Sequence, residues 1–277
     1  MSRLYALDPA MPVLLRPDGA VQVGWDPRRA VLVQPPEGTT PAALAALLRD
    51  MAVPLGIAEL RRLAGRHGVP DVDQLLTALV SRGVVHDRAR RSAPRALSIR
   101  VHGCGPLSDL LVEALRRSGA RIAQTSHANA AVSAAGADMV VLSDYLVTDP
   151  RLVRELHTAG VPHLPVRVRD GAGLVGPLVI PGVTSCLSCA DLHRTDRDRA
   201  WPAVAAQLRD VIGNADRPTV LATAAIALGQ LQRIITAVRG QEAAGAPPAT
   251  LNTTLQVDVT SNTISARRWS RHPNCQC

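Results

Sequence analysis

Pro181-Gly182-Val183-Thr184-Ser185-Cys186-Leu187-Ser188-Cys189 is the stretch around which the rest of the chain is organised. It carries two cysteines in a C-x-x-C spacing, and the sequence ends on two more in a C-x-C spacing, His272-Pro273-Asn274-Cys275-Gln276-Cys277. Two close pairs of thiols far apart in a chain can supply four ligands to one tetrahedral zinc ion. We therefore predict a structural zinc site made of Cys186, Cys189, Cys275 and Cys277.

Other uses of these cysteines stay open on the residues alone. They are a redox-active C-x-x-C, a pair of disulfides, buried unreactive thiols, and a zinc site in which His272 replaces one sulfur. A redox motif needs no second pair of thiols, and structural disulfides are rare inside cells. The C-x-C pair reaches a single metal only if the backbone turns there, because alternate residues of an extended strand lie about 7 Å apart.

Composition and charge narrow the class of protein. The 277 residues carry a formal net charge of +8, and all 31 basic residues are arginine. Aromatic residues make up 2% of the chain, so a base-stacking surface is poorly supplied and nucleic acid is not an expected partner. We interpret the excess arginine as a solvated surface. The sequence has neither an 18-residue apolar run nor a signal-peptide core, so we expect a cytoplasmic protein without a membrane partner.

Residues 1–90 are predicted to form a small separate domain. Three short apolar runs are expected to be strands, and three helices and a return strand follow them: 13–15, 21–23, 31–33, 40–51, 57–68, 71–83 and 84–86. This order is typical of a winged-helix-like module, which binds DNA or binds a peptide that adds a strand to an exposed sheet edge. The polar stretch 87–95 is the expected linker.

Residues 91–277 are predicted to form a second, α/β domain. Strands and helices alternate along its first half, at 96–101, 107–118, 121–123, 138–142, 149–160 and 162–168. This alternation predicts a Rossmann-like, doubly wound, mostly parallel sheet. A further strand, two helices and an antiparallel strand pair are expected at 173–180, 201–212, 219–239, 250–259 and 263–269. The last pair would return the tail to the first two cysteines.

These features together resemble a known family. A strand followed by a glycine turn, a parallel sheet, the C-x-x-C run, a long helix and a C-terminal cysteine pair are similar to the E1-like proteins of the ThiF group. The run Cys186-Leu187-Ser188-Cys189-Ala190-Asp191-Leu192-His193-Arg194 and the following Trp201-Pro202 resemble one branch of that group. This branch contains the leader-peptide-binding partners of YcaO cyclodehydratases, which make azoline-containing peptides. The resemblance spans the chain and implies an N-terminal winged-helix peptide-recognition domain.

The resemblance also assigns a nucleotide turn. Gly103 and Gly105 match its start, and Asp144 matches an acid that relatives carry at the end of a strand, so these three are the candidate cofactor-binding residues. Pro106 and Ser108 stand where further glycines would be expected, which limits how closely a phosphate could approach. A chain without lysine also lacks the phosphate-contacting lysine of active relatives.

The function implied is therefore that of a non-catalytic scaffold. It would bind the leader of a precursor peptide and present it to a YcaO-type partner, without catalytic residues and without using ATP, and it could form a homodimer. Two alternatives stay open: an active ATP-dependent adenylyltransferase, and a DNA-binding regulator, which the mostly acidic and apolar third helix disfavours.

Three further assignments complete the sequence-based predictions. Cys104 is expected to be a small buried residue in a tight turn rather than an acyl-accepting thiol. Trp201 and Trp269 are expected to be core anchors near the zinc. The alternating acids and arginines after the C-x-x-C motif are interpreted as an ion-pair network rather than a docking surface: Asp191, Arg194, Asp196, Arg197, Asp198 and Arg199.

Overall fold

The chain divides into two compact units, Met1–Pro94 and Arg95–Cys277. The computed structural model describes residues 3–89, 96–126, 136–238 and 247–277. The predicted linker 87–95 falls mostly on 90–95, which lie outside the described residues. Each unit has its own hydrophobic core, so each is described separately.

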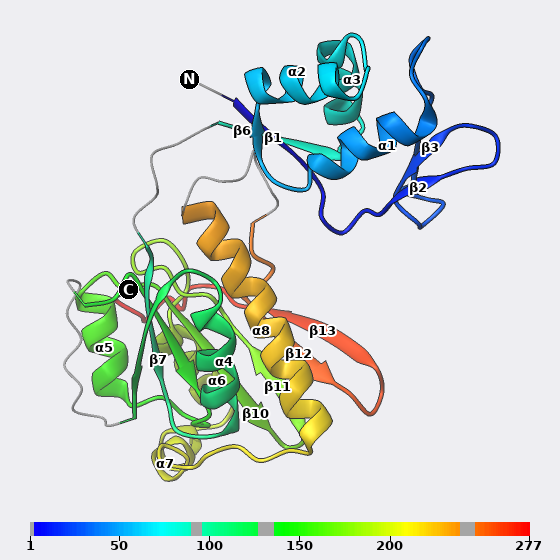
Figure 1. The fold of residues 1–277 in the computed structure, drawn as a ribbon. Coiled ribbons are helices and arrows are strands. Elements are labelled where there is room, and N and C mark those ends of the chain that lie inside the picture. The colour runs from blue at the N-terminus through cyan, green and yellow to red at the C-terminus, as the bar shows by residue number, and fades with distance from the viewer. Residues whose placement is uncertain (1–2, 90–95, 127–135, 239–246) are drawn as a thin grey trace. The chain divides into compact units, whose positions relative to one another are not determined.

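In its described residues, 3–89, the N-terminal unit contains two small antiparallel sheets and three helices (Figure 1). Its elements are β1 (Arg3–Leu7), β2 (Val13–Leu15), β3 (Val21–Val23), β4 (Val31–Val33), α1 (Pro41–Asp50), β5 (Leu55–Gly56), α2 (Ile57–Arg66), α3 (Val72–Ser81) and β6 (Val85–Ala89). The strand orders are β5-β1-β6 and β2-β3-β4. The three predicted strands, three helices and return strand are confirmed. The sequence did not predict β1, which depends on β6, its pairing partner some 80 residues later.

Helix ends in this unit follow from side-chain capping. Thr40 accepts a hydrogen bond from the backbone of Ala43 at the start of α1, and Asp71 accepts one from Gln74 at the start of α3. Such caps satisfy amide groups that have no partner inside the helix. The apolar face of α1 packs on β2 and β3, where Val21 is fully buried, while α2 packs on β1 and α3 on β6.

The second unit is built on one seven-stranded sheet (Figure 1). Its elements are β7 (Ser98–His102), α4 (Pro106–Arg116), β8 (Arg121–Thr125), β9 (Met139–Ser143), α5 (Pro150–Thr158), β10 (His163–Arg169), β11 (Ala172–Val175), α6 (Leu187–Arg197), α7 (Trp201–Gln207), α8 (Arg217–Val238), β12 (Thr253–Asp258) and β13 (Thr263–Arg268). The strand order is β13-β12-β11-β10-β9-β7-β8. The α/β class predicted for this unit is confirmed.

The prediction of a mostly parallel sheet is wrong, because three of the six strand pairings are antiparallel, and only the pairing of β12 with β13 was predicted to be so. Strands β8, β7, β9 and β10 pair in parallel, whereas β10, β11, β12 and β13 pair antiparallel. Asp170 and Gly171 form the two-residue connection between β10 and β11, and both have positive φ. A turn of this kind reverses the chain, while parallel pairing needs a crossover of a dozen residues or more.

Helices cover both faces of the sheet. Along β9, Met139 and Val141 join the core under α4 and α8, while Val140 and Leu142 join the core under α5 and α6. Figure 1 shows α4 and α8 side by side over one face. Among the described helices, α8 is long and apolar enough to cross a membrane, but it packs on β10, β11 and β12, and a core helix passes the same test.

Candidate functional site

The four predicted cysteines converge on one point. Their sulfur atoms lie within 4.8 Å of one another, with Sγ to Sγ distances of 3.7 Å for Cys186 to Cys189, 3.6 Å for Cys186 to Cys275 and 3.3 Å for Cys189 to Cys277. Four sulfurs at about 2.3 Å from a tetrahedral metal are about 3.8 Å apart. The cysteines are free thiols, at distances too long for disulfides. The arrangement fits one metal ion.

Helix α6 and the C-terminal tail supply the two halves of this cluster. Cys186 is the N-cap of α6 and Cys189 lies in its first turn, so the C-x-x-C motif is the start of a helix. Residues three apart on a helix lie on one face, which aims both sulfurs the same way. In the tail, the amide of Cys275 donates to the carbonyl of His272 at 3.0 Å, so the chain turns immediately before the C-x-C pair.

His272 has a different role from that of a sulfur replacement. Its buried imidazole accepts a hydrogen bond from the amide of Asn274 at Nδ1 (3.1 Å), so Nε2 carries the proton and donates to Asp196 Oδ2 at 2.8 Å. Both ring nitrogens are therefore engaged. The same geometry argues against a second metal site at His193, Asp196 and His272, although these groups also lie within 4.8 Å of one another.

The electrostatics of the thiol cluster are uneven. Burial raises the pKa of Cys186 and of Cys275. Burial opposes ionisation of Cys189 as well, but hydrogen bonds from the backbone of His272 and Cys186 outweigh it and lower the pKa of Cys189 to about 7. The backbone of the tail and of the start of α6 therefore favours the thiolate form of Cys189. A cation would remove the other protons, since metal binding releases them from thiols.

The glycine turn lies at the start of α4, where a nucleotide-binding fold would hold phosphate. Here the carboxylate of Asp144 fills that position. It accepts hydrogen bonds from the amides of Leu107 (3.0 Å) and Ser108 (3.1 Å) and from the Ser108 hydroxyl. Asp144 is buried, so the helix N-terminus is capped from inside the protein. Cys104, predicted to be buried, is exposed, because the turn points it outward.

The space beside this turn is small. A cavity of about 60 Å³ lies at the carboxyl ends of β7 and β9, lined in part by His102, Tyr145 and Arg209. Sites for small molecules usually measure roughly 300 to 1,000 Å³. Burial lowers the pKa of His102, which therefore adds no positive charge at neutral pH. The cavity that the described residues form at this switch point of the sheet is thus smaller than that range.

We expect Gly103→Ala to destabilise the second unit by about 1 to 3 kcal/mol, the cost of overpacking a filled site. A Cβ at Gly103 would lie 2.3 Å from the carbonyl oxygen of Ser143. Gly229→Ala in α8 is the matched control, because a Cβ there meets nothing within 4 Å. Denaturant unfolding of both variants checks this, and equal stability of the two would show that the close approach to β9 is not needed.

The N-terminal unit offers a groove with an open strand edge. In the order β2-β3-β4, β4 has no strand on its outer side among the described residues. A groove of about 410 Å³ separates it from α3, and its lining is largely apolar: Val31, Leu32, Val33, Gln34, Pro36, Pro70, Asp71, Gln74, Leu75, Ala78, Leu79 and Arg82. The sequence predicted an exposed edge in this unit but could not say which strand provides it.

The backbone of Leu32 faces this groove. Two backbone hydrogen bonds, from Gly24 to Pro12 and from Arg16 to Ala20, show that Ala20 and Gly24 face β2. Gln22 lies two residues from each of them, so its amide and carbonyl also point toward β2. Successive residues of a strand point their amides and carbonyls toward opposite neighbours, so the backbones of Val21 and Val23 bond to β4. Leu32 lies opposite Gln22, and its amide and carbonyl therefore point away from β3. The carbonyl of Leu32 accepts a hydrogen bond from Arg82 at 3.4 Å across the groove.

Comparisons with known proteins establish the fold. No family model and no curated protein matches the sequence. Among solved structures, a heterocyclase in complex with substrate and cofactor matches with a TM-score of 0.66 at 14% identity, and the heterocyclase TruD with 0.65 at 17%. Each alignment covers 99% of this chain but only 39% and 42% of those chains, so this chain spans about two fifths of either. MccB of E. coli with ATP matches at 0.56 and 12%, over 99% of both chains. This likeness shows that the chain shares the fold of these proteins.

Proposed function

We propose that the chain is a leader-peptide-binding member of the ThiF/E1-like group, a non-catalytic scaffold that presents a precursor peptide to a YcaO-type cyclodehydratase. The observation that carries this proposal is the groove between β4 and α3, where the backbone of Leu32 faces an open sheet edge. A peptide strand would bond to that edge and place alternate side chains among the apolar residues of α3. Arg82 at the groove could pair with an acidic residue of the peptide.

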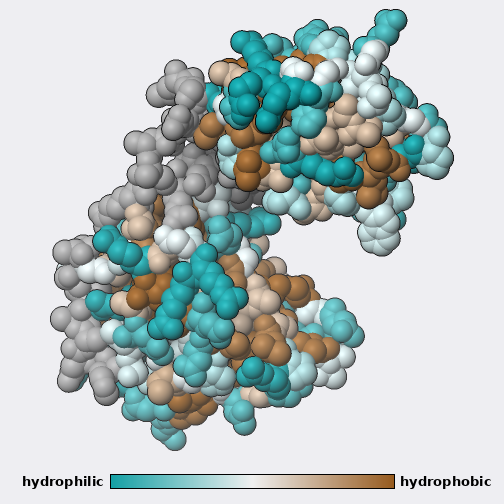
Figure 2. Space-filling model, viewed as in Figure 1, coloured by the Kyte–Doolittle hydropathy of each residue, from teal (hydrophilic) through white to brown (hydrophobic). Residues whose placement is uncertain are grey.

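The surface of the N-terminal unit supports binding of a partner. Figure 2 shows hydrophobic residues among hydrophilic ones on the visible surface of this unit. Leu15, Trp25 and Leu32 of the β2-β3-β4 region are exposed by 52%, 81% and 46%. Leu32 lines the groove, whereas Leu15 projects from the other face of the sheet, so Leu32 is the exposed apolar side chain among these three that a peptide in the groove would contact. The groove and its exposed leucine support the winged-helix-like recognition domain that we propose for this unit.

The cysteine cluster supports a structural zinc ion within the scaffold. All four ligands are thiols, which leaves no position for a catalytic water, and four-cysteine zinc sites are structural. The ion would fasten the start of α6 to the last residues of the chain. Such a site is consistent with a protein of the cytoplasm, where thiols stay reduced.

The second candidate function is that of an active adenylyltransferase. It is considered because the fold also resembles that of E. coli MccB, whose structure was solved with ATP. Against it stand the carboxylate of Asp144 at the N-terminus of α4, the small cavity beside it and the absence of lysine from the sequence. We expect no exchange of labelled pyrophosphate into ATP, with or without a peptide. Measurable exchange would favour the adenylyltransferase.

The proposal is tested with the full chain and candidate leader peptides, taken from any short precursor encoded near its gene. Fluorescence anisotropy of the labelled leader should show micromolar binding, and a YcaO-type protein from the same neighbourhood should modify the precursor faster when the chain is added. A leader that stays unbound at hundreds of micromolar, together with modification that ignores the chain, would overturn it.

A further inference from the structure

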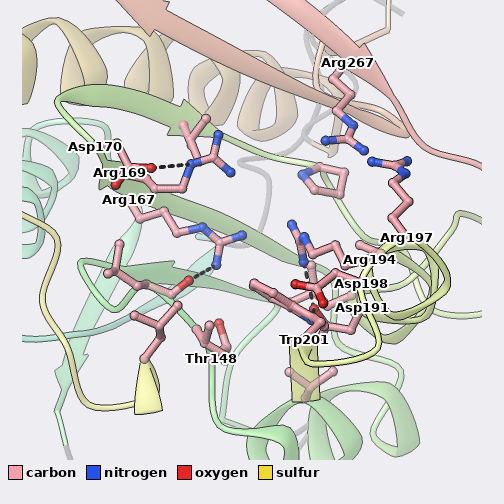
Figure 3. A pocket seen from close by; sticks show the side chains of 18 residues that line it. Thr148, Arg167, Arg169, Asp170, Asp191, Arg194, Arg197, Asp198, Trp201 and Arg267 are labelled. Atoms are coloured by element: carbon pink, nitrogen blue, oxygen red, sulfur yellow. Dashed lines mark hydrogen bonds and ion pairs between the residues drawn. The ribbon is translucent and has the colours of Figure 1, made fainter. Parts of the chain in front are cut away.

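A cavity of about 460 Å³ lies beside α6, on the face of the sheet opposite α4. Its lining contains five arginines from three segments: Arg167 and Arg169 of β10, Arg194 and Arg197 of α6, and Arg267 of β13. Figure 3 shows their side chains around one common space. Neither the glycine turn nor the groove of the N-terminal unit contributes to it.

Acidic side chains balance this charge only in part. Asp191 pairs with Arg194 at 2.7 Å and also accepts a hydrogen bond from the indole of Trp201. The other two aspartates of the lining are Asp170, 3.7 Å from Arg169, and Asp198, which caps the backbone of Ala200. Arg197 and Arg267 have no acidic partner within the described part of the chain. The sequence predicted a network of ion pairs after the C-x-x-C motif. Among the arginines of that network, Arg194 is the one that forms an ion pair within the described residues, and its partner is Asp191.

The electrostatic effect is mutual repulsion of positive charges. Burial lowers the pKa of Arg267, and Arg197, Arg194 and Arg169 lower it further. Burial, followed by the charge of Arg194, lowers the pKa of Arg167 to about 10. Both groups still carry their charge at neutral pH, so the cavity keeps an excess of positive charge that an anion would relieve.

The guanidinium groups are also held in place. Arg167 donates to the carbonyl of Leu146 at 2.8 Å, and Arg194 lies over the rings of Trp201 and Trp269 at 5.0 and 5.2 Å. Arg267 lies 4.3 Å from the ring of Trp269. The two tryptophans therefore support arginines of this cavity. A ligand would meet charges that are already oriented, which lowers the entropy cost of binding.

We propose that this cavity binds a small ligand that carries a phosphate group. Five arginines face three aspartates, and a phosphate monoester, with a charge of about −1.5 to −2 at pH 7, matches the remaining excess better than a single carboxylate. Planar guanidinium groups also bind phosphate oxygens in pairs. The volume lies in the range of small-molecule sites, and apolar residues such as Leu174 and Pro177 can contact an uncharged part of the ligand. The inference is independent of the proposed peptide binding.

Calorimetry on the full chain tests it with four probes at constant ionic strength: inorganic phosphate, pyrophosphate, ATP and succinate. We expect at least one phosphate probe to bind. If the site recognises the anion alone, free phosphate or pyrophosphate should bind as well as ATP. If the site recognises a nucleotide, ATP should bind much more tightly than either. The double variant Arg197→Gln, Arg267→Gln should weaken binding at least tenfold, about 1.4 kcal/mol.

Arg268→Gln is the matched control, because Arg268 follows Arg267 on β13 and its side chain projects from the other face. Its affinity for the phosphate probes should equal that of the unchanged protein, and the melting temperatures without probe verify that the variants fold. Three results would each overturn the proposal: no phosphate probe binds at millimolar concentration, succinate binds as tightly as the phosphates, or Arg268→Gln weakens binding as much as the double variant.

Discussion

We expect the Cys186→Ser variant to purify without the metal ion and with a second unit destabilised by at least about 3 kcal/mol. Structural zinc sites contribute about 10 to 16 kcal/mol of binding free energy in small domains, and losing a third of that is a large fraction of the stability of a protein. A serine hydroxyl is a poor zinc ligand, and it would leave three thiols around an incomplete site.

The position of the cluster explains why the effect should be large. Cys186 and Cys189 are buried in the same core as Leu156 and Val179, beneath α5. The proposed metal would join this core to the C-terminal tail, which is otherwise held by the hydrogen bonds of His272 to Asp196, of Arg271 to Gly182 and of His193 to Ser270. Without the ion, the last three residues of the tail would lose their link to α6, and the remaining thiols would lose their common partner.

Cys104→Ser provides the control for this prediction. Cys104 is exposed and lies outside the cluster, so its replacement should change neither metal content nor unfolding. Metal is counted per chain by plasma mass spectrometry, and stability is measured by denaturant unfolding. Unchanged zinc in Cys186→Ser would refute the four-thiolate site, and equal losses in both variants would point to a general effect of removing a thiol.

The sequence predicted those features that depend on local pattern or on a restricted chemistry. Hydrophobic spacing placed most helices and strands to within a few residues. The strand predicted at 173–180 ends at Val175, the helix predicted at 201–212 ends at Gln207, and α6 was not predicted. The cysteine cluster was predicted although Cys186 and Cys275 are 89 residues apart, because few arrangements other than a metal site use two such pairs.

Features that depend on three-dimensional neighbours were missed. Asp170 and Gly171 form an Asp-Gly pair, which is the strongest short-range signal for a hairpin. The hairpin was not predicted, because the alternation of strands and helices before it indicated parallel pairing. The capping of α4 by Asp144 joins residues 36 to 37 positions apart, and no local pattern indicates it. The arginine cavity gathers side chains from β10, α6 and β13, whereas the sequence showed only the part on α6.

Leu32→Pro should weaken leader-peptide binding by roughly fivefold to 150-fold while leaving the fold of the N-terminal unit intact. Proline removes the one amide of β4 that faces the groove, and an unmade hydrogen bond costs about 1 to 3 kcal/mol. Proline is tolerated on an edge strand where the lost amide faces away from the sheet. The variant therefore removes a donor for the incoming strand without removing a bond of the sheet.

Leu15→Pro on the opposite edge of the same sheet separates strand addition from general damage. Leu14 and Arg16 turn their amides toward β3, so the amide of Leu15 also faces outward, but from β2 and away from α3. Anisotropy titrations of the labelled leader should then show full affinity for Leu15→Pro and reduced affinity for Leu32→Pro, at equal melting temperatures. Equal affinities would place the peptide elsewhere on the protein. If Leu15→Pro alone weakened leader binding, the peptide would bind at the β2 edge of the sheet, where the side chain of Leu15 is 52% exposed.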